Sequence, residues 1–406
     1  MTSTVVLGLG GGVDYELKLS TSDLEKLAGE YQIRAGELTS CITVTNERAL
    51  VISILGHIKK GGGGEHFVAS APALHAFAAR FTKRVTLGGT SVRAAIAMSR
   101  LGVPSTLHLV TLNDPIRRLL PETCDYIGSF DQDTLYPHLI VQYDQDTPVR
   151  AGDIEIRAPF ANRLIYVNDP ANEALLLSAE LGSRLRTARV FLISGFNAVR
   201  DERVLDQRLA TLTEHMRHLP PEAIVYYEDA AFHRPDLNQR LRAALVDAID
   251  IYGLNEDEMQ AHLGRDVDLL SVVEVERALK SLHSLIPAPN LVLHTRYWSA
   301  ALGTRAGEFA EPLNDGIVMA STRYFHGDEH TDEQYEFMRG RPRRTEGVDF
   351  ALALERRMGG VVRCVPGLRL DVAEPTTIGL GDTFVGGFLA AICKRADTPR
   401  SSRTLG

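Results

Sequence analysis

From about residue 164 onward, short apolar runs alternate with amphipathic segments, and this alternation limits the possible folds more than any other feature of the sequence. The apolar runs lie at Leu164–Val167, Val190–Ile193, Ala223–Tyr227, Ala248–Tyr252 and Asn290–Leu293. Helical spacing fills the stretches between them, at Val204–Arg217, Leu237–Val246, Glu256–Leu263 and Val272–Leu285. Strands that alternate with helices in this way predict βαβ units and a mostly parallel sheet.

The first part of the chain continues this pattern. Val5–Leu9 is an apolar run that leads straight into glycines, and Thr106–Val110 has the character of another strand. Ala71–Ala79 and Thr90–Leu101 have helical spacing. We therefore expect the N-terminal region to contribute to the same α/β domain.

Two strand-like segments, Leu135–Gln142 and Ile154–Ile165, break the alternation. The turn-rich stretch QYDQDTPVRAGD joins them, which predicts antiparallel hairpins, and Ile42–Val44 is expected to lie with them. We predict a small β-rich lid above a large α/β domain, with the lid at 15–60 and 125–163 and the large domain at 1–14, 61–124 and 164–406. Gly61–Gly64 is predicted to be a hinge or loop. The further predictions are a charged loop at 322–345 and a frayed tail over the last ten residues.

Composition excludes several classes of protein. The net charge of −8 and the lack of a strongly basic run argue against a nucleic-acid partner. The four cysteines are too far apart for zinc spacing or a readable disulfide framework. The start has no basic segment, and no window approaches the roughly 18 apolar residues of a membrane span. We expect a cytosolic protein without a membrane partner, and its oligomeric state stays open.

The stretch TIGLGDTFVGGF, at 377–388, carries the strongest chemical signal. Gly379 and Gly381 let the backbone approach a ligand closely. The helix expected after them would point free N–H groups at that ligand and make an anion site. Asp382 could then accept a proton from an attacking hydroxyl while the amides hold a phosphoryl group. The alternative is that Asp382 only caps the helix, since Asp is a favoured N-cap.

GLGDTFVGGF resembles the Gly-x-Gly-Asp signature of ribokinase-like sugar kinases. The resemblance implies that Asp382 is the catalytic base and that the amides of Gly379, Leu380 and Gly381, with that of Asp382, form the anion hole. IYGLNEDEM resembles the Asn-x-x-Glu motif of the same superfamily, with Asn255 and Glu258 in place. Its use there would be to hold waters of a magnesium ion, which keeps several waters and few carboxylates. An acidic cluster at a helix start can also serve only for capping.

Further stretches resemble one branch, the ADP-dependent glucokinase and phosphofructokinase family. VYYEDAAF resembles its His-x-Glu strand end, which makes Glu228 a second acid near the metal. LHTRYWSAALG resembles its nucleotide-side segment. The residues that the resemblance assigns to the nucleotide are Asn255, His294, Thr295 and Arg296. On the acceptor side, GLGGGVDYELKL, LGGTSVRAAIAMSRLGV and SGFNAV resemble family segments. They imply that the acceptor contacts Asp14, Gly88, Gly89 and Asn197. The run VPGLRLDVAEPTTIGLGDTF also matches, so the resemblance extends in family order over most of the chain.

The departures from the family pattern lie near the metal and in the lid. Tyr226 replaces the family's metal-side histidine, and Asn197 stands where the family has glutamine. The chain is somewhat short, and most of the lid shows no clear similarity, so the acceptor is the least defined partner.

Other nucleotide and catalytic motifs do not fit. The glycine runs at 8–12 and 61–64 lack the Gly-Lys-Ser/Thr ending of a P-loop, and the glycines after the first strand do not match Gly-x-Gly-x-x-Gly. The histidines form no His-Glu-x-x-His pattern, and Ser194 lacks a Gly-x-Ser-x-Gly elbow.

The resemblance implies a ribokinase-like three-layer α/β/α sandwich with a smaller lid, acting as a kinase. Its donor would be ADP, yielding AMP, and its acceptor a hydroxyl of a hexose or hexose phosphate, with Mg²⁺ held by Glu228 and Glu258. One alternative is an ATP-dependent kinase of another sugar, nucleoside or polyol. The other is a non-catalytic sugar- or nucleotide-binding regulator, which the presence of all three acids, Asp382, Glu228 and Glu258, disfavours.

Overall fold

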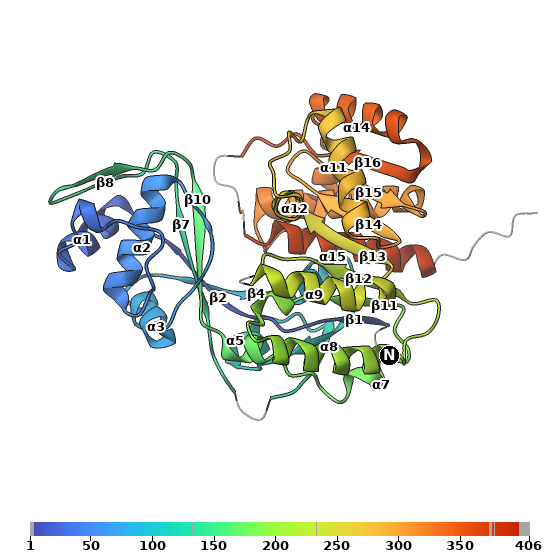
Figure 1. Ribbon diagram of the computed structural model, residues 1–406, viewed down its shortest axis with the longest axis horizontal. Coiled ribbons are helices and arrows are strands. Elements are labelled where there is room, and N and C mark those ends of the chain that lie inside the picture. The colour runs from blue at the N-terminus through green and yellow to red at the C-terminus, as the bar shows by residue number, and fades with distance from the viewer. Residues whose placement is uncertain (1–3, 131–132, 233, 373–375, 377, 398–406) are drawn as a thin grey trace, which may run out of the picture.

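The computed structural model describes residues 4–130, 133–232, 234–372, 376 and 378–397. Figure 1 shows a large lobe with helices on both sides of a sheet and a smaller lobe beside it. No helix in the described part of the chain is long and apolar enough to cross a membrane.

The large lobe is built on a sheet of nine strands within the described residues, in the order β16-β15-β14-β13-β12-β11-β1-β5-β6. All neighbours from β6 to β14 are parallel, while β15 and β16 pair antiparallel. The strands are β1 (Val5–Leu7), β5 (Ser105–Leu109), β6 (Cys124–Gly128), β11 (Val190–Ile193), β12 (Ile224–Glu228), β13 (Ile251–Asn255), β14 (Asn290–His294), β15 (Trp298–Gly303) and β16 (Val362–Pro366).

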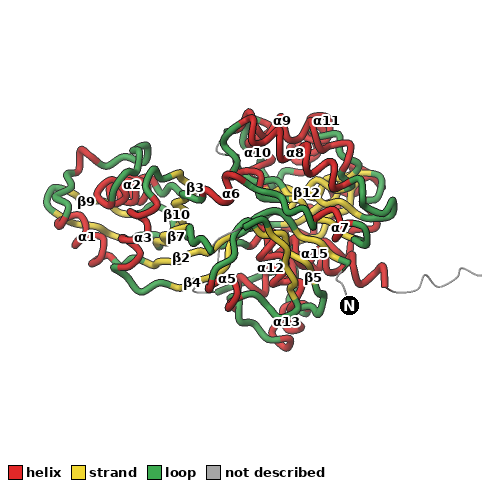
Figure 2. Tube along the Cα trace, turned by 90° about the horizontal axis from the view of Figure 1, so that it is seen from below, coloured by secondary structure: helices red, strands yellow, loops and turns green. Residues whose placement is uncertain are grey.

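Two hydrophobic cores, one on each face of this sheet, produce the three layers. Successive strand residues alternate between them: Val6 and Phe191 belong to one core, and Leu7 and Leu192 to the other. The first face carries α7 (Leu181–Leu185), α8 (Glu202–Met216), α9 (Pro235–Leu245), α10 (Glu256–Leu263), α11 (Val272–Leu285) and α14 (Thr345–Met358). The second carries α4 (Thr90–Arg100), α5 (Asp114–Leu119), α12 (Ala310–His326), α13 (Asp332–Arg339) and α15 (Leu380–Asp397). Figure 2 shows helices above and below the strands of this lobe, which confirms the predicted α/β/α sandwich.

The smaller lobe contains a five-stranded sheet in the order β3-β10-β7-β2-β4. Its strands are β2 (Gly12–Lys18), β3 (Gly64–Phe67), β4 (Arg84–Gly88), β7 (His138–Tyr143) and β10 (Asn162–Val167). A hairpin of β8 (Pro148–Ala151) and β9 (Ile154–Arg157) extends from it. Three helices, α1 (Thr21–Glu30), α2 (Glu47–Lys60) and α3 (Ala71–Ala79), cover one face and bury a third hydrophobic core. The other face looks toward the large lobe.

The strand pairing differs from the predicted domain boundaries at three segments. Residues 64–88, assigned to the large domain, contribute β3, α3 and β4 to the lid. Leu164–Val167, also assigned there, pairs with β3 and β7 in the lid sheet. Conversely, residues 125–128, which the prediction places in the lid, belong to β6 at the edge of the large sheet. A run of apolar residues reports burial, not the identity of the neighbouring strand.

The prediction of a loop over 322–345 was wrong. The segment holds the last turn of α12 and all of α13, which begins with a capping box between Thr331 and Gln334. Tyr335 and Met338 anchor this short helix in the core. Gly61 ends α2 in the left-handed conformation, and Gly64 begins β3. The predicted tail lies, apart from Asp397, outside the described residues.

Candidate active site

A cavity of about 850 Å³ lies between the open face of the lid sheet and the carboxyl ends of the large sheet's strands. Strand ends contribute Glu228, Asn255 and His294, and the lid contributes His138 and Arg163. Ligands of open α/β sheets bind outside the carboxyl ends of the strands, so this is where a substrate is expected.

The Gly-x-Gly-Asp turn forms one wall of this cavity. Gly379 has φ +64° directly before α15, a conformation that favours glycine. A Cβ at Gly379 would also lie 2.4 Å from Arg93 Cδ, so the turn packs closely on that arginine. Asp382 lies in the first turn of α15, two residues inside its start, and accepts a hydrogen bond from Thr90 Oγ1 at 2.8 Å. The carboxylate is thus held by a side chain of α4, and Asp382 lies past the N-cap position of its own helix.

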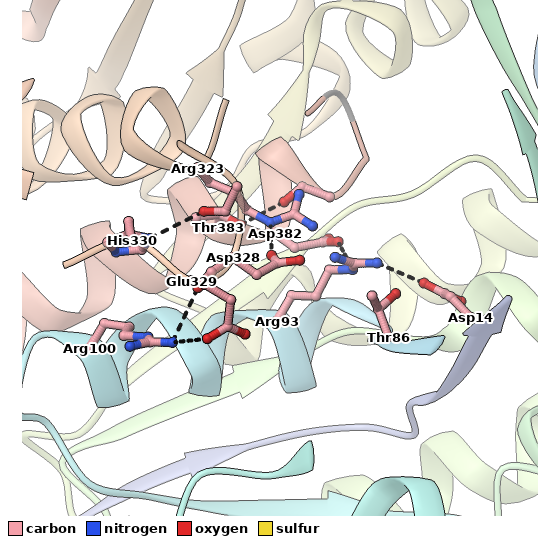
Figure 3. A network of polar contacts seen from close by, with 12 residues as sticks. Asp14, Thr86, Arg93, Arg100, Arg323, Asp328, Glu329, His330, Asp382 and Thr383 are labelled. Atoms are coloured by element: carbon pink, nitrogen blue, oxygen red, sulfur yellow. Dashed lines mark hydrogen bonds and ion pairs between the residues drawn. The ribbon is translucent and has the colours of Figure 1, made fainter. Parts of the chain in front are cut away.

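Asp14 lies on β2 and is almost fully buried beside Arg93. Arg93 Nη2 donates to Asp14 Oδ2 at 2.7 Å, and its Nε lies 3.8 Å from Asp382 Oδ2. Figure 3 shows Arg93 between these two carboxylates. A Cβ at Gly88 would lie 2.4 Å from Asp14 Oδ1, and Gly89 has φ +92°, so both glycines are needed where β4 turns into α4. Gly89 lines the cavity, whereas Gly88 supports Asp14 from behind.

His138 connects Asp14 to a second buried carboxylate. Its Nδ1 lies 3.6 Å from Asp14 Oδ1 and its Nε2 lies 3.3 Å from Asp169 Oδ2. Burial opposes the charged ring, but the hydrogen bond to Asp169 and the two carboxylates outweigh it and raise the pKa of His138 to about 9. Asn172 donates to Asp169 at 2.6 Å and accepts from the Gly11 amide at 3.1 Å, which fixes the glycine turn after β1.

The buried acid Glu228 ends β12 and faces His294. His294 Nε2 lies 2.8 Å from Glu228 Oε1, and its ring packs on Phe384 at 4.8 Å. Burial raises the pKa of Glu228 despite the histidine, while the glutamate outweighs burial and raises the pKa of His294. Glu228 Oε2 and the Tyr226 hydroxyl both pack against Gly253. A Cβ at Gly253 would lie 2.1 Å from each of these two oxygens, so the position has no room for a side chain. The family's metal-side histidine is therefore replaced here by a buried phenol next to the acid.

Asn255 and Glu258 form the capping box of α10. Asn255 Oδ1 accepts from the Glu258 amide at 3.0 Å, and Glu258 Oε2 accepts from the Asn255 amide at 2.8 Å. Both also line the cavity. Burial, together with the charges of Asp229 and Glu228, raises the pKa of Glu258 well above its ordinary value. The motif therefore does cap α10, and the Glu258 carboxylate also borders the cavity.

Three other predicted residues lie around the cavity. Asn197 follows β11 in a short 3-10 turn and lines the cavity. Thr295 Oγ1 donates to the Trp298 carbonyl at 2.7 Å and so shapes the turn between β14 and β15. Arg296 is exposed and lies 3.3 Å from Glu256.

The acids fit a water-coordinated Mg²⁺ better than a directly bound one. Within the described residues, no group of three or more His, Cys, Asp or Glu side chains is close enough to hold a metal ion by itself. However, only Oε1 of the buried Glu228 is bonded to His294, while Oε2 lies beside the Tyr226 hydroxyl, and Glu258 lies near the charges of Asp229 and Glu228. A hydrated divalent cation would satisfy both carboxylates, so the residues fit the ion that the family resemblance implies.

Sequence reasoning missed the residues that link the two lobes. Arg163 lies on β10 and lines the cavity. Burial and Arg93 lower its pKa, although the charges of Asp382 and Asp257 act to raise it. Arg163, His138 and Asp169 lie outside any recognised motif, because their role depends on strand pairing. Arg93 did leave a signal, since it is the one charged residue in the stretch TSVRAAIAM, whose other residues are small or apolar.

Comparisons with known proteins agree with this geometry. The structure is similar to a hypothetical ADP-dependent phosphofructokinase from Pyrococcus horikoshii OT3, at 16% identity and a TM-score of 0.77, covering 97% of this chain and 98% of that one. A phosphofructokinase from the same organism, solved with AMP, matches at 16% identity and a TM-score of 0.75, with the same coverage. An ADP-dependent kinase in complex with fructose-6-phosphate and ADPβS matches at 11% identity and 0.73, covering 97% and 94%. These likenesses confirm the fold.

A comparison with curated proteins found no match. The family model for the ADP-specific phosphofructokinase/glucokinase conserved region matches residues 3–304, a stretch that includes Asp14, Glu228 and His294 and ends before the Gly379–Asp382 turn. The chain therefore belongs to the ADP-specific phosphofructokinase/glucokinase family and is an ADP-dependent sugar kinase, a phosphotransferase with an alcohol acceptor.

Proposed function

We propose that the chain transfers the terminal phosphoryl group of ADP to a hydroxyl of a hexose or hexose phosphate, yielding AMP, with Asp382 as the base. The observation that carries this proposal is the position of Asp382 in the first turn of α15, at the cavity wall, with Thr90 bonded to its carboxylate at 2.8 Å. The AMP, ADPβS and fructose-6-phosphate named for the similar structures support the choice of ligands.

The start of α15 supports both halves of the chemistry. Asp382 would take the proton of the attacking hydroxyl, as its oxygen Oδ2 is not engaged by Thr90. The amides of Leu380, Gly381 and Asp382 lie in the first turn of the helix, where backbone N–H groups are free to hold the transferring phosphoryl group. Arg163, on the lid, adds positive charge to the same space and would help to neutralise the charge that develops in transfer.

Asp14 is the proposed acceptor ligand, and Gly89 and Asn197 line the same cavity. The carboxylate already accepts from Arg93 at 2.7 Å, which fixes its orientation in a buried setting. A carboxylate has about four acceptor positions, so sugar hydroxyls can still donate to it. Gly88 and Gly89 would let the sugar approach the backbone closely. The lid face that carries His138 and Arg163 would exclude water when the sugar is bound.

On the donor side, we propose that Asn255, His294, Thr295 and Arg296 contact the nucleotide. All four line the cavity at the ends of β13 and β14. Glu228 and Glu258 would hold Mg²⁺ through water molecules. When bound, the ion supplies positive charge that neutralises the phosphate oxygens. A cytosolic location stays a prediction, which fractionation of cells that express the chain would test.

The test is phosphoryl transfer by the purified protein with Mg²⁺, comparing ADP and ATP across sugars, sugar phosphates and nucleosides. We expect AMP to form with ADP, and Asp382→Asn to lower kcat by roughly 10²–10⁴. Asp201→Asn is the matched control, because Asp201 caps α8 away from the cavity and Asn caps equally well. Turnover with ATP alone would refute the donor. Full activity of Asp382→Asn would refute the base, and nucleotide binding without turnover would favour the regulator.

A further inference from the structure

A second cavity, of about 650 Å³, lies behind the catalytic turn. Its walls come from β4, α4, the end of α12 and the segment that leads into α13. Arg93 and Thr383 border it, and Arg93 also borders the active cavity. Figure 3 shows Asp14 on one side of Arg93 and Arg323, Asp328 and His330 on the other. The two cavities therefore share one arginine and are otherwise lined by different side chains.

Positive charge exceeds negative charge around this second cavity. Its described lining contains five arginines, at 84, 93, 100, 118 and 323, against the three carboxylates of Asp328, Glu329 and Asp332. Asp328 is shared between Arg84 and Arg323, each at 2.5 Å. Arg100 lies 3.3 Å from Glu329. Asp328 is thus engaged by two arginines and Glu329 by one, while Arg93 is engaged by Asp14 and Asp382 on the side of the active cavity.

Within the described residues, two of the three guanidinium nitrogens of the buried Arg323 have no hydrogen-bond partner. Its side chain is 5% exposed, and only Nε is engaged, with Asp328. Nη1 and Nη2 are buried and have no hydrogen-bond partner among the described residues. Burial and the nearby Arg93 lower the pKa of Arg323, although the charge of Asp328 acts in the opposite direction. The negative charge around the guanidinium is therefore too small to offset its burial. Arg323 lines the cavity, and its two buried guanidinium nitrogens require an acceptor. Carboxylate and phosphate oxygens match the fork of an arginine.

His330 adds a requirement of the opposite kind. His330 is 6% exposed, and its Nδ1 lies 3.3 Å from the carbonyl oxygen of Gly327. A carbonyl only accepts, so Nδ1 carries the proton, and Nε2 of the neutral ring is an acceptor. Burial lowers the pKa of His330, which favours that neutral ring. Nε2 is buried and has no partner within the described chain. The same cavity therefore offers strong donors and one unfilled acceptor.

We propose that this cavity is a second ligand site that binds a phosphate-class oxyanion carrying a P–OH group, with inorganic hydrogen phosphate as its simplest member. The phosphate oxygens accept from Nη1 and Nη2 of Arg323, and the P–OH donates to Nε2 of His330. Sulfate has the same shape and charge but no proton to donate at neutral pH. The site should therefore prefer phosphate, which goes beyond the proposed kinase reaction.

Calorimetric titration of the full chain with inorganic phosphate and with sulfate tests the proposal without any assay of activity. We expect phosphate to bind at least tenfold more tightly than sulfate, and Arg323→Met to weaken phosphate binding at least tenfold. Arg163→Met is the matched control, because Arg163 lines the active cavity. Its substitution should leave this binding unchanged. Loss of phosphate binding in Arg163→Met but not in Arg323→Met would assign the anion to the active cavity and overturn the proposal.

His330→Phe provides a second variant in case Arg323→Met fails to fold. It retains a buried ring and removes the acceptor, so phosphate affinity should fall to that of sulfate. Equal affinity of the unaltered protein for phosphate and sulfate would overturn the role of His330 and with it the proposal. Glycerol 3-phosphate distinguishes the source of the ligand: binding tighter than that of inorganic phosphate, lost in Arg323→Met, would support the site with a phosphate ester as its occupant.

Discussion

His138 should carry a proton in the folded protein at neutral pH, although it lies in a cavity wall. The two carboxylates that flank it, Asp169 at 3.3 Å and Asp14 at 3.6 Å, raise its pKa to about 9 against the effect of burial. In the unfolded chain the ring has an ordinary pKa of about 6.5. Between these two values the folded state holds one proton more than the unfolded state.

The sign of the stability effect follows from this difference. Stability from His138 is fully present below pH 6.5 and is lost as the pH rises through about 9. A shift of about 2.5 units corresponds to roughly 3 kcal/mol, with a slope of at most about 1.4 kcal/mol per pH unit. Because the side chain is 23% exposed, solvent screens part of this interaction, and 3 kcal/mol is the upper value.

NMR titration with ¹³C-labelled histidine Cε1 measures the pKa directly, and His138→Gln identifies the resonance. We expect a midpoint near 9 in the unaltered protein and a fall of at least about one unit in Asp169→Asn, which removes the hydrogen-bonded charge. Asp144→Asn is the control, since Asp144 pairs with Lys18 at the lid surface. Urea unfolding should lose more stability between pH 6.5 and 9 in the unaltered protein than in His138→Gln. A His138 midpoint at or below 6.5 in the unaltered protein would refute the reasoning. So would a midpoint that Asp169→Asn leaves unchanged.

Three further predictions concern buried groups. Gly88→Ala puts a Cβ 2.4 Å from Asp14 Oδ1 and should displace that carboxylate. The KM for the acceptor should therefore rise by about tenfold, while the affinity for the nucleotide is unchanged. An unchanged KM for the acceptor would contradict this geometry. Asp229 is a buried carboxylate that Tyr252, His262 and Asn238 share as their hydrogen-bond partner. Asp229→Ala should therefore lower the free energy of unfolding in urea by about 3–5 kcal/mol, against about 1 kcal/mol for the helix-cap variant Asp201→Ala. Glu228→Gln should raise the Mg²⁺ concentration for half-maximal activity, and an identical Mg²⁺ dependence would exclude Glu228 from the metal site.

The large sheet was predictable because strands buried on both faces are apolar along their length. Val190–Ile193 matches β11 residue for residue, and Ala71–Ala79 matches α3. The assignment of strands to sheets was not predictable in the same way. Leu164–Val167 is as apolar as β11, yet its neighbours are β3 and β7 in the lid. Pairing partners far apart in the chain leave no mark on a local pattern.

The residues of the candidate site likewise fall into those that a local motif identifies and those that depend on strand pairing. Asp382, Glu228 and His294 lie at a helix start or a strand end, where short motifs identify them, and the cavity brings them together. The lid residues Arg163 and His138 enter the cavity only because two lid strands turn one face toward it. Each stands alone in its segment, so no spacing of residue types could point to it.

The order in which the two sheets become complete has a consequence for synthesis. All five lid strands lie before residue 168, whereas β1 of the large sheet waits for β11, which begins at Val190. A chain emerging from the ribosome can therefore finish its lid while the large sheet consists of β6, β5 and β1 alone. Until β11 arrives, Val5–Leu7 pairs with β5 on one side, and its other edge has no strand beside it. We expect the nascent chain to be most prone to aggregation in this interval, because an unpaired strand edge can pair with another chain.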